Sequence, residues 1–191
     1  AALGVLPECD AVLVSDYGSG LITPSLVTSI RRSIAKRGRR RRVPILVDSR
    51  HQLLRYRGLT ACTPNESEAE SMLGRQIGDD SRRLERAGRE ILKRTRSEGV
   101  VLTRGSRGMS VFVPGQRTAH LPIYGTDEIA DVTGAGDTVI AVISLALASG
   151  ASLYEAARLA TYAGGLVVMK RGTATVSGDE LRRAVAAAGS E

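Results

Sequence analysis

The segment Asp131-Val-Thr-Gly-Ala-Gly-Asp137, followed at once by the apolar run 138–147, decides how this chain folds. Gly134 and Gly136 allow a tight backbone turn, in which only the methyl group of Ala135 occupies space. The apolar run predicts a helix, and the first amides of a helix have no partner within it. Together with the helix dipole, these outward-pointing amides predict a pocket for an anion, most naturally a phosphate.

Asp137 stands at the start of the same helix, beside the predicted anion pocket. A carboxylate there is useful if it accepts a proton or meets a metal, which predicts a general base acting on a hydroxyl that attacks a phosphoryl group. The alternative is that Asp137 caps its helix and that the glycines form an ordinary turn, because Asp is favoured at helix starts. Glycine motifs also have many false positives, so this segment alone leaves both interpretations open.

The composition predicts one globular domain, residues 1–191, with a core of aliphatic side chains. Hydrophobic residues make up 42% of the 191 residues and charged residues 25%, which are ordinary globular values. There is no Trp and only one Phe, Phe112, so Val, Leu, Ile and Ala must form the core. Such a core is typical of a parallel sheet covered by helices.

The net charge of +7 comes largely from the run Lys36-Arg-Gly-Arg-Arg-Arg-Arg42. A basic run of this kind is typical of a nucleic-acid or anionic-surface patch, or of a solvated connector between a helix and a strand. No aromatic residues for base stacking are interleaved with it, which favours the connector. A steep salt dependence of binding would support the nucleic-acid alternative.

The cysteines and the hydropathy pattern point to a cytoplasmic protein without a membrane partner. Cys9 and Cys62 lack the spacing of a zinc site and suggest a reducing compartment. No signal peptide is visible, and the apolar stretch 139–148 is too short to cross a bilayer.

Short apolar runs alternate with helical patterns along the chain, which predicts an α/β fold with a mostly parallel sheet. The expected strands are 11–15, 44–48, 59–63 and 100–103, with a β-hairpin formed by 109–113 and 118–123. The expected helices are one that starts at Thr23-Pro24 and fades at Gly38, and others over 65–73, 81–95, 136–149, 152–169 and 178–188.

The carboxyl ends of these strands carry Asp16, Asp48, Asn65 and the turn 103–108, and ligands of parallel sheets collect at that edge. Asn65 and Glu68 are three residues apart at a helix start, so they could hold a hydrated magnesium ion. They could equally be a plain helix start with acids favoured by the dipole. The turn 103–108 could approach nucleotide phosphates, or it could be an ordinary glycine turn.

Three of these motifs together resemble a known family. Thr-Pro-Asn-x-x-Glu (63–68), Thr-x-Gly-x-x-Gly (103–108) and Asp-x-Thr-Gly-Ala-Gly-Asp (131–137) occur in the order seen in the ribokinase-like, or PfkB, carbohydrate kinases. The sub-family most similar to the chain is the D-glycero-β-D-manno-heptose 7-phosphate kinases, which form the kinase half of bifunctional ADP-heptose synthesis proteins. Three further segments carry that resemblance: Ser15-Asp-Tyr-Gly-x-Gly20, Arg55-Tyr-Arg-Gly58 and Gly172-Thr-Ala-Thr-Val-Ser177.

The resemblance implies a three-layer αβα fold and an ATP-dependent sugar kinase with Mg²⁺, and a monovalent cation is a further candidate cofactor. Its partners would be ATP, a sugar phosphate and either a second copy of the chain or a complementing chain. Asp137 would be the catalytic base. The remaining roles that the resemblance implies are an anion hole at Gly134, Ala135 and Gly136; ATP and magnesium at Asn65 and Glu68; the nucleotide at Thr103, Gly105 and Gly108; the adenine at Ala163, Gly164 and Gly165; and the substrate at Asp16, Asp48 and Arg50.

The chain departs from the family pattern at three positions and in its extent. Ser19 replaces the usual Lys of the first glycine loop, Asp48-Ser49-Arg50 replaces Asp-Pro-Lys, and Thr161 replaces Asn on the helix expected beside the adenine. The strand expected at 11–15 resembles a mid-fold strand of the family. We therefore expect the ATP-binding, carboxy-terminal portion of the fold, without the amino-terminal strands and lid, and no nucleotidyltransferase domain. A non-catalytic nucleotide-binding module with an exposed sheet edge near 11–15 is the alternative to a kinase.

Overall fold

A six-stranded sheet with the order β1-β2-β3-β4-β5-β6 forms the centre of the computed structural model, which describes residues 2–36, 42–125 and 132–189. Strands β1 to β4 are parallel, whereas β5 is antiparallel to β4 and β6 is antiparallel to β5. The strands are β1 (Val12–Asp16), β2 (Ile45–Ser49), β3 (Ala61–Cys62), β4 (Gly99–Thr103), β5 (Met109–Phe112) and β6 (Ala119–Leu121).

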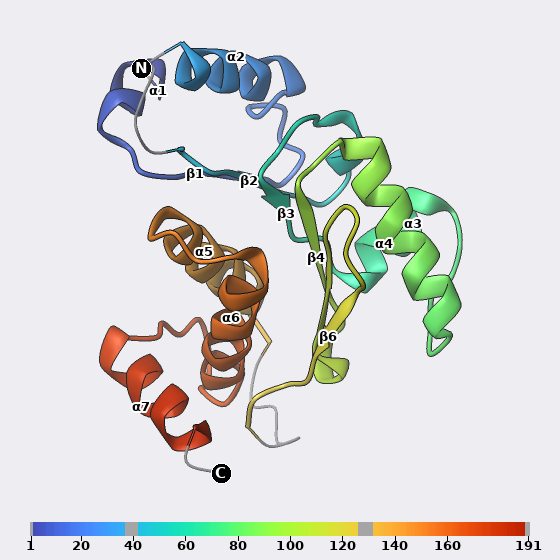
Figure 1. Ribbon diagram of the computed structural model, residues 1–191, viewed down its shortest axis with the longest axis vertical. Coiled ribbons are helices and arrows are strands. Elements are labelled where there is room, and N and C mark those ends of the chain that lie inside the picture. Colours follow the sequence, from blue (N-terminus) through green and yellow to red (C-terminus); the bar gives the residue numbers. More distant parts are fainter. Residues whose placement is uncertain (1, 37–41, 126–131, 190–191) are drawn as a thin grey trace.

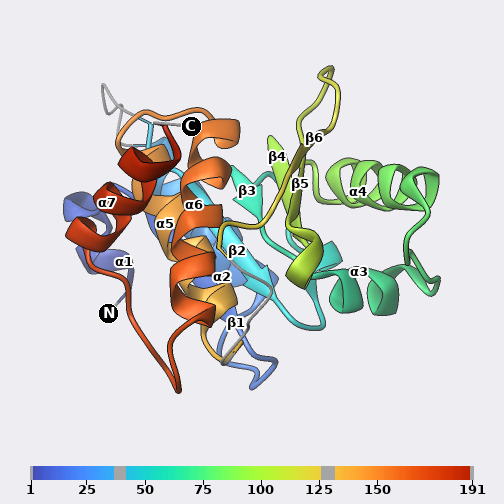
Figure 2. The same ribbon diagram turned by 90° about the horizontal axis from the view of Figure 1, so that it is seen from below.

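Helices cover both faces of this sheet, so the helices and the sheet together form three layers (Figures 1 and 2). One face carries α2 (Pro24–Ala35), α3 (Glu66–Leu73) and α4 (Ser81–Thr95). The other face carries α5 (Ala135–Ala148) and α6 (Leu153–Val168), and α7 (Gly178–Ala188) packs on α6. The short elements are α1 (Ala2–Val5) and the 3-10 turns η1 (Leu6–Glu8), η2 (Leu53–Arg55) and η3 (Gly105–Arg107).

Alternating side chains of the central strands supply two separate hydrophobic cores. In β2, Ile45 and Val47 face the layer of α2 to α4, whereas Leu46 faces α5 and α6. All three are at most 5% exposed. Because both faces of each central strand are buried, the strands are continuous apolar runs, and the expected α/β sheet is confirmed.

Polar residues cap the starts of several helices, and Thr23 was expected to do so. Thr23 Oγ1 accepts a hydrogen bond from the Leu26 amide (3.2 Å), and Pro24 occupies the first turn of α2. Reciprocal side-chain and backbone bonds of a capping box, Ser152 with Glu155 and Ser177 with Glu180, begin α6 and α7. These caps fix helix starts within one or two residues of the predicted positions.

Some expectations were incomplete, and others fall outside the described residues. β3 is shorter than the expected 59–63, and the sequence analysis did not anticipate α1. Cys9 and Cys62 form no disulfide. Residues 37–41 of the basic run and Asp131 lie outside the described residues. Nowhere in the described ranges is a helix both long and apolar enough to cross a membrane.

Gly88 in α4 lies against the ring of Phe112, the one phenylalanine, which is fully buried. We expect Gly88→Ala to lower the free energy of unfolding by about 1–3 kcal/mol, because the new methyl group would overlap the ring, although Ala favours helices over Gly. Urea unfolding measures the loss. The control is Gly136→Ala, a helical glycine with open space around its added methyl group, and an equal loss there would contradict the prediction.

Candidate active site

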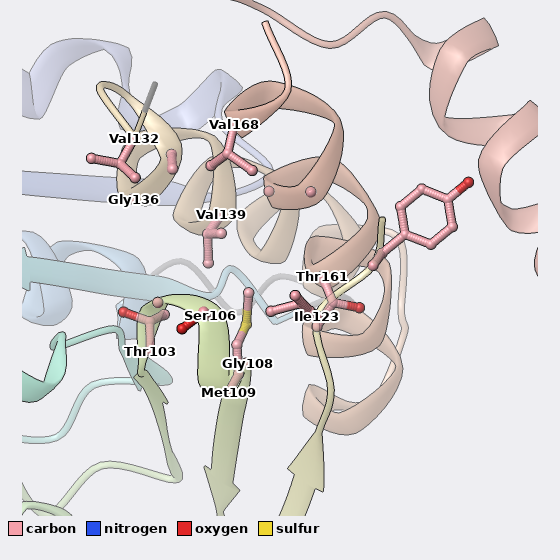
Figure 3. Close-up of a pocket in the computed structure, with 15 residues that line it drawn as sticks. Thr103, Ser106, Gly108, Met109, Ile123, Val132, Gly136, Val139, Thr161 and Val168 are labelled. Atoms are coloured by element: carbon pink, nitrogen blue, oxygen red, sulfur yellow. The ribbon is translucent and has the colours of Figure 1, made fainter. Parts of the chain in front are cut away.

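A pocket of about 170 Å³ opens where the turn after β4 faces α5 and α6 (Figure 3). Val139 of α5 and Met109 of β5 point into the space between these elements. The lining is mostly apolar and rich in glycine, as in sites that hold flat organic ligands. Its residues are Thr103, Gly105, Ser106, Gly108, Met109, Ile123, Tyr124, Val132, Ala135, Gly136, Val139, Thr161, Gly164, Gly165 and Val168.

Two glycines allow the close backbone approaches that form the pocket walls. Gly108 has φ of +75°, and a side chain there would collide with the Leu121 carbonyl group. Gly165 on α6 lies equally close to the Tyr124 carbonyl group. The chain after β6 can therefore run between the turn and α6, which closes one side of the pocket.

Most of the residues predicted to contact the nucleotide or its phosphates line this pocket. They are Thr103, Gly105, Gly108, Ala135, Gly136, Gly164 and Gly165. Ala163 does not line the pocket, because its side chain lies on the fully buried face of α6; Thr161 lines the pocket from the same helix. The helical spacing of Thr161, Gly164, Gly165 and Val168 could have identified the correct face.

The α5 helix begins at the glycine turn, as predicted. Gly134 is the N-cap in the left-handed conformation, with φ of +81°, and has no side chain to cap the helix. The Ala135 amide is already used, because it donates to the Val132 carbonyl oxygen (3.2 Å). The next amides, of Gly136 and Asp137, belong to the first turn, where a helix offers no internal acceptor. Of the predicted anion-hole amides, that of Ala135 is therefore occupied, whereas the amides of Gly136 and Asp137 are candidates for binding an anion.

Asp137 is exposed and is not the cap of α5, so the capping alternative is wrong. The Tyr17 hydroxyl instead donates to both of its carboxylate oxygens, at 3.1 Å each. The Arg50 guanidinium lies 4.6 Å from the centre of the Tyr17 ring, within cation–π range. Tyr17 thus connects Arg50 to Asp137. Tyr17 was not among the residues predicted to form the site.

Asp16, predicted to contact substrate, is only 3% exposed and serves instead as a buried acceptor. It accepts hydrogen bonds from the Tyr56 hydroxyl (2.7 Å), the Ser49 hydroxyl (2.8 Å) and the Gly18 amide (3.0 Å). Burial acts to raise the pKa of Asp16, but these three donors together hold it below its ordinary value. The geometry supports a role in fixing the ends of β1 and β2.

Asp48, at the end of β2, has a raised pKa. Burial, followed by the negative charges of Glu68 and Asp137, raises its pKa to about 6, although Arg50 acts in the opposite direction. Its Oδ1 atom is buried and has no hydrogen-bond partner among the described residues. The unpartnered oxygen of Asp48 is a hard ligand of the kind that a hydrated divalent cation binds.

Asn65 and Glu68 form a capping box at the start of α3. Asn65 Oδ1 accepts from the Glu68 amide (2.8 Å), and Glu68 Oε2 accepts from the Asn65 amide (2.9 Å). Across the described ranges, no group of three or more His, Cys, Asp or Glu side chains is close enough to hold a metal ion directly. A magnesium ion held by these residues would need water ligands, as Mg²⁺ commonly does.

Glu66 joins α3 to the turn after β4, a contact that the sequence analysis missed. Its Oε2 atom pairs with Arg107 (2.6 Å) and with Arg104 (3.3 Å), and the Glu66 and Arg104 side chains are 11% and 13% exposed. No sequence signal connects these partners, since they are 38 and 41 residues apart. The ion pairs hold the glycine turn beside α3.

Comparison with known proteins places this arrangement in a family. The sequence matches the pfkB family carbohydrate kinases over residues 10–180. The chain belongs to the pfkB carbohydrate kinase family. Among curated pfkB relatives, the bifunctional protein HldE of Geobacter sulfurreducens is 44% identical over 173 residues, or 90% of this chain and 34% of that protein. HldE of Methylococcus capsulatus is 43% identical over 182 residues, which are 95% of this chain and 37% of that one.

Solved structures show the same ribokinase-like fold. Arabidopsis thaliana ribokinase complexed with ribose and ATP superposes with a TM-score of 0.77 at 22% identity, over 96% of this pfkB chain and 58% of the ribokinase. Escherichia coli phosphofructokinase-2 in complex with potassium gives 0.80 at 20% identity, over 98% and 60%. The chain therefore spans about a third of its curated relatives and over half of these structural neighbours.

Asp16→Asn should lower the free energy of unfolding by about 1–3 kcal/mol near neutral pH, because its amide nitrogen leaves a buried donor unpaired. The folded-state pKa of Asp16 lies below 3.8, so its contribution is present above that value and disappears as the pH falls through the folded-state pKa. The difference between wild type and variant should therefore shrink on acidification.

Urea unfolding at about pH 7 and about pH 3 measures this difference. Glu8→Gln, at an exposed position before β1, is the control for removing a carboxylate. A difference that grows toward acid would contradict the assigned network.

Proposed function

We propose that this chain supplies the ATP-binding and phosphoryl-transfer centre of a sugar kinase. The observation that carries the proposal is the placement of α5. Ala135 and Gly136 in its first turn line the apolar pocket, while Asp137 in the same turn lies beside Asp48 and Tyr17. The proposed sites for the adenine ring and the phosphates and the proposed proton acceptor, Asp137, therefore adjoin at the start of α5.

The pocket between the β4–β5 turn and α6 fits the adenine ring. Apolar side chains of Met109, Ile123 and Val168 offer flat contact, and Gly164 and Gly165 leave room for a ring. From there the phosphates would extend toward the first turn of α5, whose amides and dipole favour negative charge. Thr103 also lines the pocket.

Mg²⁺ would be held by Asp48 and by Asn65 and Glu68 through water, and it would neutralise charge on the phosphates. Asp48 supports this assignment most directly, because a cation would offset the burial and the repulsion that raise its pKa. Arg50, which lies beside Asp48, would partly replace the lysine that is usual in the family. The replacement is partial because a guanidinium and an ammonium bind phosphate differently.

Asp137 would accept the proton of a sugar hydroxyl as that oxygen attacks the γ-phosphorus. The bond from the γ-phosphorus to the bridging oxygen breaks, and ADP leaves. The amides of Gly136 and Asp137 would stabilise the negative charge on the transferred group.

The proposed acceptor is heptose 7-phosphate. Identity above 40% to HldE proteins over at least 90% of this chain supports a shared acceptor, as does the sub-family resemblance of 15–20, 55–58 and 172–177. The reaction would contribute to ADP-heptose synthesis. The location of the sugar on the carboxyl edge of β1 and β2 follows from the position of Asp137 beside Tyr17 and Asp48.

A second candidate is a nucleotide-binding module that acts only with a complementing segment. The order of the sheet favours it, because β1 pairs with β2 and with no other described strand, and Leu13 in β1 is 39% exposed. An unpaired strand edge can accept another strand. On this alternative the chain binds ATP but transfers no phosphate alone.

Calorimetry of ATP binding with and without magnesium, followed by ADP release after adding heptose 7-phosphate, separates these functions. Magnesium-dependent binding and sugar-dependent ADP release are expected for the kinase. Binding without release would favour the module, and absence of ATP binding would reject both.

Gly136→Val should weaken ATP binding at least about tenfold while leaving the fold intact. A side chain at position 136 has no neighbour within 4 Å in the protein, so it would occupy the phosphate path rather than disturb packing. Calorimetry and thermal unfolding measure the two effects. Gly178→Val, in the first turn of α7, is the matched control, and equal ATP affinities in both variants would contradict the placement.

Asp137→Asn should lower kcat by about 10²–10⁴-fold while ATP affinity stays within about threefold, because a general base contributes on that scale and the amide cannot accept the proton. Sugar-dependent ADP release measures kcat, and calorimetry measures affinity. Asp179→Asn removes a carboxylate from the first turn of α7 and should leave both unchanged. Full turnover in Asp137→Asn would exclude Asp137 as the base.

A further inference from the structure

The Tyr17 hydroxyl occupies both oxygens of the Asp137 carboxylate, each at 3.1 Å. The two residues are 120 positions apart and come from the β1 loop and the start of α5. Because the Tyr17 side chain is 53% exposed, burial does not force this contact. The hydroxyl reaches across an open site to the one group that the proposed reaction needs as a base.

The position of Tyr17 is fixed from two sides. Arg50 lies over its ring, 4.6 Å from the guanidinium carbon to the ring centre. The neighbouring residue Asp16 accepts from the Gly18 amide through its side chain, and its carbonyl oxygen accepts from the Arg50 amide (3.2 Å). Tyr17 and Arg50 are thus anchored to one buried residue.

An exposed base beside bound ATP has an unwanted reaction available. A base must lie within hydrogen-bond reach of the proton that it removes, and at an exposed carboxylate water meets that condition as readily as a sugar does. Water activated there would attack the γ-phosphorus, the bond to the bridging oxygen would break, and the water proton would pass to Asp137. The products would be ADP and inorganic phosphate, with no sugar phosphorylated.

We propose that Tyr17 suppresses this hydrolysis by occupying Asp137 until a sugar hydroxyl replaces it. The inference rests on the proposed function, because it takes Asp137 as the base. A sugar held by several contacts displaces the phenol from the carboxylate, whereas a single water competes poorly with a donor held in place by Arg50. Tyr17 is therefore a positioning residue that makes proton removal depend on the acceptor.

Tyr17→Phe tests the proposal by removing one oxygen atom and keeping the ring under Arg50. Release of phosphate from ATP and magnesium, without sugar, should rise by about tenfold to a hundredfold, the scale of a hydrogen bond to a charged group. Tyr154→Phe is the matched control: it also removes an exposed tyrosine hydroxyl, 46% exposed, on the outer end of α6, and its hydrolysis should equal that of the wild type. A merely structural role for Tyr17 would not raise hydrolysis.

Unfolding in urea tests the contact without relying on activity. The midpoints of Tyr17→Phe, Asp137→Ala and the double variant form a cycle, in which a direct hydrogen bond gives shifts that do not add. Additive shifts would overturn the proposal, as would hydrolysis in Tyr17→Phe that stays at the wild-type level, including none in either protein. Sugar-dependent ADP release from the same samples separates failure of the Tyr17 proposal from failure of the proposed function. Phosphate transfer to the sugar with unchanged hydrolysis would reject the Tyr17 proposal alone. Absence of ATP binding by the wild type would reject the kinase function.

Discussion

Burial of the parallel sheet on both faces is the constraint on which the rest of this structure depends. Side chains within β2 to β4 alternate between two hydrophobic cores, so the interiors of these strands have little room for polar groups. The first places where polar side chains are tolerated are the strand ends. Asp16, Asp48, Asn65 and Thr103 stand at those positions, and the parallel direction brings all of them to one edge. The first turn of α5, a helix on the face of the sheet opposite α2 to α4, adds Asp137 to that edge.

Asp16 is the exception that organises this edge, because its charge is buried rather than open to a ligand. Three donors satisfy it, and together they join the β1 loop, the end of β2 and Tyr56. A buried carboxylate that loses a donor is costly, so this arrangement leaves few alternatives for the β1 loop. This network also positions Tyr17, which follows Asp16 in the chain, and Arg50, whose amide donates to the Asp16 carbonyl oxygen. The buried residue therefore acts on the candidate active site through its neighbours.

The sequence was sufficient for the layers, most element boundaries and the glycine-rich half of the pocket, because local patterns determine these features. Apolar runs mark buried strands, and Thr23, Ser152 and Ser177 mark helix starts through contacts within three residues. It was insufficient for Asp16 and Ala163, whose exposure depends on packing from other elements. It also missed the contacts of Tyr17 with Asp137 and of Glu66 with Arg104. Those partners are far apart in the chain, and only the three-dimensional fold brings them together.

The carboxyl edge of the sheet combines a structural role with the proposed binding of Mg²⁺ by Asn65, Glu68 and Asp48. Asn65 and Glu68 satisfy each other in a capping box, so α3 has its start without any ion. Asp48 has no such compensation. Because its folded-state pKa is raised from 3.8 to about 6, the unfolded chain releases that proton first, and stability falls as the pH rises between these values. A cation placed beside Asp48 would replace the missing proton. The fold thus tolerates a locally unfavourable carboxylate at the point where the proposed reaction requires a positive charge.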